Sequence, residues 1–186
     1  NGVRFTQAYA HTVCCPSRAA LLTGRHPQRS GINSWTQGNM KGADGVNMAF
    51  EEVTIAEALK TEGYRSALFG KWHVGSHRDS GPMKQGFDEF FGIRNGFIDN
   101  FNHYFLHGKG YHDLYEGTTE VFQKGEYFPD LITGRALQFM EKNKALLLLE
   151  NLTHENAKKN AQLPETLATR EFVLKQKINL AEQNLI

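Results

Sequence analysis

The sequence of 186 residues has little cysteine, and its only two cysteines, Cys14 and Cys15, are neighbours. A disulfide between adjacent residues is strained and cannot join distant segments, so no disulfide framework organises the chain. The longest strongly apolar stretch, Leu146 to Leu149, is four residues, too short to cross a bilayer. The formal net charge of +1 gives no global field that would attract nucleic acid. We therefore expect neither a nucleic-acid partner nor a membrane span.

The remaining composition is that of an ordinary globular protein. Hydrophobic residues make up 40% and charged residues 22%, enough for one domain with a sizeable core. A capping box of Thr54 and Glu57 predicts a helix in "TIAEALKTEGY", with Gly63 after its last turn. The apolar segment 65–69 then predicts a strand that Gly70 ends. A helix followed by a short strand indicates an α/β layer fold.

The second half of the chain changes character twice. Residues 75–129 are rich in Gly, His and aromatic residues without clear periodicity, which predicts a long looped excursion. A helix is expected from about Asp130. Beyond it, leucine and isoleucine recur at spacings of four and seven, which predicts an amphipathic helix. We therefore divide the chain into residues 1–144 and a divergent tail, residues 145–186.

One stretch, "CCPSRAALLTGR", carries possible chemistry. Pro16 suits the first turn of a helix and Gly24 its end, so a helix is expected from about Pro16 to Thr23 with Cys14 just before it. A helix N-terminus favours an anion, a nearby thiol has a lowered pKa, and the fork of Arg18 matches a tetrahedral oxyanion. The simpler interpretation is two small buried cysteines and a solvated arginine.

The same stretch resembles the signature of the type I sulfatases, which reads Cys, any residue, Pro, Ser, Arg, three residues, Leu, Thr, Gly, Arg. In this register Cys14 is the key cysteine, Cys15 is the variable position, and every fixed position is matched. A second block, "GYRSALFGKWHVG", is similar to the second sulfatase signature and contributes Lys71 and His73. The resemblance covers roughly residues 1–144.

The resemblance implies a chemistry for these residues. Cys14 would be converted to formylglycine by a maturation enzyme that reads the contiguous Cys-x-Pro-x-Arg sequence, and Cys15 would stay a cysteine. The hydrated aldehyde would attack the sulfur of a sulfate ester. Arg18 would hold the diol, Lys71 would contact the sulfate, and His73 would contact the sulfate or protonate the leaving oxygen. Arg25 is expected to anchor the helix end.

The resemblance also implies a fold, a cation and a setting. The fold is an alkaline phosphatase-like α/β fold, a mixed central sheet flanked by helices, expected here to be incomplete with an open edge. The cation is Ca²⁺, with Mg²⁺ as the alternative, bound partly through the modified Cys14. The substrate would be a sulfated small molecule or glycan, and the family setting is periplasmic, secreted or lysosomal.

Two departures from the family limit this expectation. The acidic metal ligands of the family precede the first residue here or follow residue 186. Of the ligands that the family uses for its cation, this chain is therefore expected to contain only the modified Cys14. After Lys144 the sequence leaves the pattern, and a strand at Leu146 to Leu149 with His154 as a displaced site residue is the less favoured interpretation. The alternatives are therefore a phosphonate or phosphodiester hydrolase with the same formylglycine, or a truncated remnant without catalysis.

Overall fold

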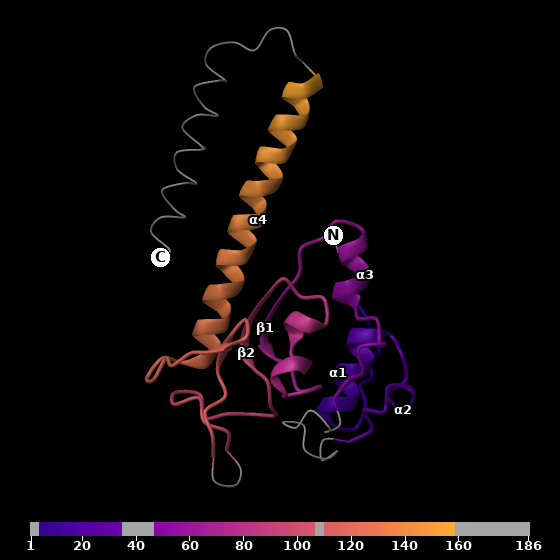
Figure 1. Cartoon of the computed structure of the whole chain (residues 1–186), viewed down its shortest axis with the longest axis vertical. Helices are drawn as coiled ribbons and strands as arrows, with labels where there is room; N and C mark the ends of the chain where they lie inside the picture. The colour runs from indigo at the N-terminus through magenta and orange to yellow at the C-terminus, as the bar shows by residue number, and fades with distance from the viewer. Residues whose placement is uncertain (1–3, 35–46, 107–109, 159–186) are drawn as a thin grey trace. The chain divides into compact units, whose positions relative to one another are not determined.

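The computed structural model describes residues 4–34, 47–106 and 110–158. The chain forms two compact units, Asn1–Phe139 and Met140–Ile186. The first unit holds a four-stranded sheet and the helices around it (Figure 1). The boundary predicted after residue 144 and the role of the tail stay predictions. The leucines expected to form the amphipathic helix of the tail lie at positions 163, 167, 174 and 185, outside the described residues.

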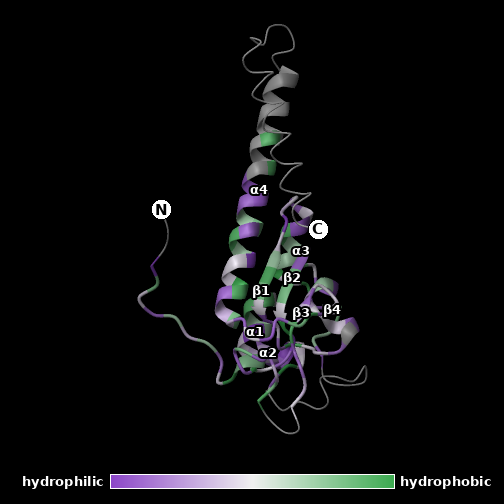
Figure 2. Ribbon diagram, turned by 90° about the vertical axis from the view of Figure 1, so that its left-hand side faces the viewer, coloured by the Kyte–Doolittle hydropathy of each residue, from purple (hydrophilic) through white to green (hydrophobic). Residues whose placement is uncertain are grey.

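The sheet is mixed, as predicted. Strand β1 (Ala67–Lys71) pairs in parallel with β2 (Glu89–Ile93), which pairs antiparallel with β3 (Tyr115–Glu116), and β3 continues antiparallel into β4 (Thr119–Glu120). Among the described strands, β1 has a neighbour on one side only. Both long strands are hydrophobic (Figure 2), because they lie between two layers of helices.

Two expectations about the strands were wrong. The strand expected at residues 65–69 is β1, which begins two residues later and runs through Gly70 to Lys71. The predicted loop 75–129 contains β2 and two short 3₁₀ helices, Arg78–Ser80 and Pro82–Lys84. Gly70 and Gly92 face each other across the β1–β2 pair, and a Cβ on Gly92 would lie 1.8 Å from the carbonyl oxygen of Gly70. The two strands can therefore meet only if position 92 is glycine.

Three helices cover one face of the sheet. They are α1 (Cys14–Thr23), α2 (Pro27–Ser30) and α3 (Ile55–Thr61), and α1 packs against both others. The predicted capping box of α3 is present, with Thr54 and Glu57 each accepting a hydrogen bond from the backbone N–H of the other. The core beneath these helices is formed by Cys15, Ala19, Leu22, Ile32, Met48, Ala56, Trp72, Val74 and Phe87.

The first turns of α4 (Phe128–Lys158) cover the opposite face. Phe139 contacts Phe69 of β1 edge to face at 5.8 Å, and the guanidinium of Arg135 lies 4.8 Å from the ring centre of Phe91 on β2. The sheet thus has helices on both faces, as the α/β expectation requires. The alternative strand at residues 146–149 is wrong, because α4 continues as one helix through these positions. None of the helices in the described part of the chain is both long and apolar enough to span a membrane.

Candidate active site

Helix α1 begins at Cys14, two residues earlier than the sequence indicated. Its N-cap is Val13, whose side chain forms no capping hydrogen bond. Gly24 ends the helix as predicted, and it does so in the left-handed conformation with φ of 65°. Cys14 is half-buried and Cys15 is buried. Cys14 therefore lies in the first turn, where the positive end of the helix dipole favours an anion.

Arg18 connects α1 to the segment that follows β1. Its Nε donates to the carbonyl oxygen of Trp72 at 2.6 Å, and its Nη2 donates to the carbonyl oxygen of Lys71. Burial lowers the pKa of the Arg18 guanidinium, while the nearby Cys14 and Cys15 sulfurs raise it. Sequence reasoning placed Arg18 near the anion but did not foresee that its fork binds the backbone at Lys71 and Trp72.

His73 reaches the site through an unusual backbone conformation. It has φ of 55°, which is uncommon outside glycine, so the backbone is no longer extended two residues after the end of β1 at Lys71. The residue is buried, with 7% of its surface exposed. Burial, together with the charges of Lys71 and Arg18, lowers the pKa of His73 to about 4. The imidazole is therefore neutral near pH 7.

The predicted site residues lie together in the structure. The ligand atoms of Cys14, Cys15 and His73 are all within 4.8 Å of one another. The ammonium group of Lys71 acts on this cluster, since its charge lowers the pKa of both His73 and Cys15. Burial nevertheless dominates at Cys15 and raises the pKa of its thiol to about 12, so Cys15 is protonated near pH 7 as long as nothing is bound. In the described part of the chain, Lys71 forms no ion pair with a carboxylate.

A group of residues around His73, which the sequence did not reveal, holds His73 in place. The His73 N–H donates to the carbonyl oxygen of Arg94 at 3.1 Å, and a Cβ on Gly96 would lie 3.1 Å from the imidazole. Buried Asp113 accepts from the N–H groups of Arg94 and Asn95, at 3.2 and 2.9 Å. This carboxylate therefore fixes the turn against which the ring packs. A lone Asp in a region without periodicity gives no sequence signal of this role.

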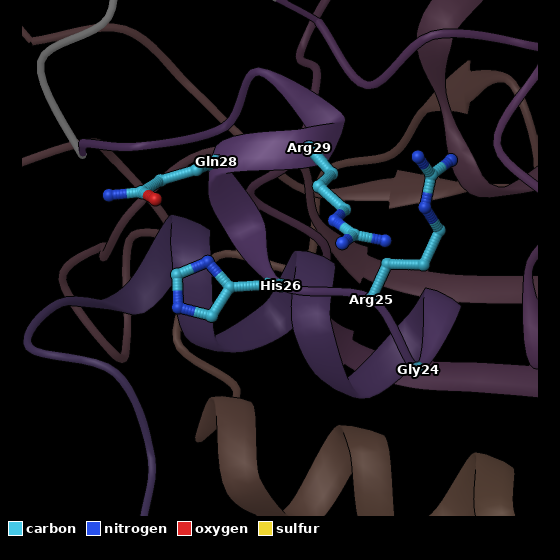
Figure 3. A pocket seen from close by; sticks show the side chains of 5 residues that line it. All are labelled: Gly24, Arg25, His26, Gln28 and Arg29. Carbon is cyan, nitrogen blue, oxygen red and sulfur yellow. The ribbon is translucent and has the colours of Figure 1, made fainter.

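The C-terminal end of α1 has a different environment. Arg25 donates from Nη1 to Glu52 at 2.7 Å, which fits the expected anchoring of the helix end. A cavity of about 570 Å³ lies here, lined by Gly24, Arg25, His26, Gln28 and Arg29 (Figure 3). It does not include Cys14, which lies at the other end of α1, about 15 Å along the helix axis. This opening is thus separate from the cysteine cluster.

Comparison with known proteins assigns the family. The family model described as Sulfatase matches residues 1–176. The chain belongs to the sulfatase family. It is 32% identical to mouse arylsulfatase J over 148 residues, which cover 75% of the chain and 24% of that relative. It is 42% identical to human steryl-sulfatase over 101 residues, which cover 50% of the chain and 17% of that relative.

A solved structure supports the same fold. The structure of BT4656 in complex with its substrate D-glucosamine-2-N,6-O-disulfate superposes with a TM-score of 0.55 at 29% sequence identity. The match covers 75% of this chain and 24% of that chain. The chain thus spans about a quarter or less of the length of these three proteins. The predicted sulfatase-like α/β fold is confirmed for this part.

The donor set near Cys14 does not fit a complete calcium site. Ca²⁺ takes about six to eight oxygen ligands, whereas the cluster of the described residues offers two sulfurs and one imidazole. If Cys14 becomes formylglycine, an oxygen replaces one sulfur, and the number of oxygen ligands is still far too small for Ca²⁺. No calcium-dependent step can therefore be derived from these residues.

Proposed function

We propose that the chain is the nucleophile-bearing part of a sulfuric ester hydrolase, with Cys14 as the position of formylglycine. The observation that supports it most is the position of Cys14. It combines a fully matched signature with the first turn of α1, in a cluster with His73 and close to the positive charge of Lys71. When present, formylglycine supplies a hydrate whose one hydroxyl attacks sulfur and whose other hydroxyl permits sulfate release.

Each neighbour then has a role that its environment allows. Lys71, without a carboxylate partner in the described residues, supplies positive charge to a sulfate oxygen. His73 is neutral near pH 7 because its pKa is about 4, so it acts as a hydrogen-bond donor rather than as a second cation. Arg18 positions both, since it binds the carbonyl groups of Lys71 and Trp72. Its charge also favours an anion at residue 14.

The substrate class is a sulfated sugar or small molecule. BT4656 has a sulfated glucosamine as its substrate, and the relatives are named after aryl and steryl sulfates. The ion that completes the site is Ca²⁺, or Mg²⁺ as the alternative, with its other ligands supplied from outside the described residues. Two alternatives must be distinguished from a sulfatase by experiment. One is a phosphonate or phosphodiester hydrolase, and the other is a remnant without catalysis.

The test has two stages. In the first, the chain is co-expressed with a formylglycine-generating enzyme, and the mass of the peptide containing Cys14 is measured by mass spectrometry. We expect an aldehyde at Cys14 and an intact thiol at Cys15, and conversion at Cys15 would contradict the register. In the second, a complete sulfatase that carries these residues is assayed with paired sulfate and phosphate esters. Faster hydrolysis of the sulfate ester, lost in Cys14→Ala and kept in Cys15→Ala, is expected. Preference for the phosphate ester, or no turnover, would refute the proposal.

A further inference from the structure

The unmodified cysteine cluster has the composition of a site for a thiophilic metal. Cys14, Cys15 and His73 each present one ligand atom, and these atoms lie within 4.8 Å of one another. In a tetrahedral zinc site with Zn–S bonds of about 2.3 Å, two sulfurs are about 3.8 Å apart. Small side-chain rotations therefore bring the three atoms onto one ion.

An independent feature of His73 also indicates a ligand. The residue is buried, with only 7% of its surface exposed, and its Nδ1 atom has no hydrogen-bond partner among the described residues. A buried polar atom without a partner is costly and calls for an explanation. A metal ion bound by the imidazole would remove that cost. Gly96 packs closely against the ring, because a Cβ at this position would lie 3.1 Å from the imidazole Cε1.

We propose that the chain, before conversion of Cys14, binds one Zn²⁺ ion through the Cys14 and Cys15 sulfurs and a His73 nitrogen, with a solvent molecule as fourth ligand. Two thiols release their protons to solvent on binding, so the two thiolates cancel the charge of the ion. The neighbouring cations then compete less with the metal. Arg18 is directed to two carbonyl oxygens, and Lys71 stands beside a neutral metal complex.

This site differs from the calcium site in ligands and in timing. Sulfur and imidazole are soft or borderline donors that select zinc, whereas calcium requires oxygen. The timing rests on the proposed function, because conversion of Cys14 to formylglycine removes one sulfur and so abolishes the zinc site. Zinc and the maturation enzyme would then compete for the same thiol.

Metal titration of the unconverted chain tests the site. The chain is expressed without the maturation enzyme, reduced, freed of metal and titrated anaerobically with Co²⁺ and then Zn²⁺. We expect one equivalent of Co²⁺, with a sulfur-to-cobalt charge-transfer band and tetrahedral visible bands, and displacement by Zn²⁺. Alkylation followed by mass spectrometry should show Cys14 protected in the zinc-bound chain and alkylated in the metal-free chain. Absence of the charge-transfer band, or alkylation of Cys14 at the same rate with and without zinc, overturns the proposal.

Variants identify the ligands. Cys15→Ser is close in size, and His73→Asn tolerates a positive φ, so both are expected to fold, which circular dichroism checks. Each should weaken Zn²⁺ binding on the order of a hundredfold or more. His26→Ala, which removes an exposed imidazole outside the cluster, should bind as the wild type does. Unchanged binding in Cys15→Ser or His73→Asn, or equal loss in His26→Ala, overturns the proposal. No substrate is used, so failure here is distinct from failure to find sulfatase activity.

Discussion

Removal of the Arg18 side chain should destabilise the chain measurably, because this arginine joins α1 to the segment after β1. Its two hydrogen bonds to the carbonyl oxygens of Lys71 and Trp72 have a charged donor. Such bonds contribute about 1.5–3 kcal/mol each. Arg18 is half-buried, so water compensates part of the loss, and we expect Arg18→Ala to lower the free energy of unfolding by about 3 kcal/mol.

Urea denaturation of the 186-residue chain, followed by circular dichroism, measures this effect. With a slope of about 2 kcal/mol per molar urea, the midpoint should fall by about 1.5 M. Arg18→Lys should lose about half as much, since an ammonium group keeps the charge but cannot donate as a planar fork. Arg29→Ala is the matched control, because Arg29 is exposed and its loss should change stability by less than about 0.5 kcal/mol. An Arg18→Ala midpoint within the range of this control would refute the reasoning.

Three further predictions concern activity and packing. In a complete sulfatase, Lys71→Ala and His73→Ala should each lower turnover about a hundredfold, since the loss of a contact to transition-state charge costs about 3 kcal/mol. Near-normal steady-state turnover in either variant would show that the substituted residue is not part of the site. The 186-residue chain should hydrolyse no arylsulfate even with Cys14 converted and Ca²⁺ added, and calcium-dependent turnover that disappears in Cys14→Ala would contradict this. Gly92→Ala should lower the free energy of unfolding, measured by urea denaturation, by several kcal/mol, because the alanine Cβ would overlap the Gly70 carbonyl oxygen. A urea midpoint equal to that of the wild type would disprove the close approach of the two strands.

Local sequence patterns predicted the features that depend on neighbouring residues. The capping box of Thr54 and Glu57 and the end of α1 at Gly24 were both predicted correctly, because cap chemistry acts over three or four residues. The fold followed from the two signatures rather than from physics alone. Strand β2 was missed because it is short and buried on both sides, so it shows no alternation of polar and apolar residues.

The geometry of the site could be predicted only in part. The two signatures named Cys14, Lys71 and His73, but the left-handed backbone of His73 has no sequence signal in a non-glycine residue. The use of Arg18 as a link between segments, and of Asp113 as a support for the turn beside His73, depends on chain positions brought together only by folding. Such roles require the tertiary structure.

The contacts of α1 have a consequence for the order of events during synthesis. Pro16 is buried in the folded chain and the guanidinium of Arg18 is bound to two carbonyl groups, yet both belong to the short sequence that the maturation enzyme is expected to read. Folding and conversion would therefore compete for the same residues, and a molecule that folds first would keep Cys14 as a thiol. The fraction of active enzyme would then depend on the ratio of two rates, so a substitution that only accelerates folding would lower activity without changing the site.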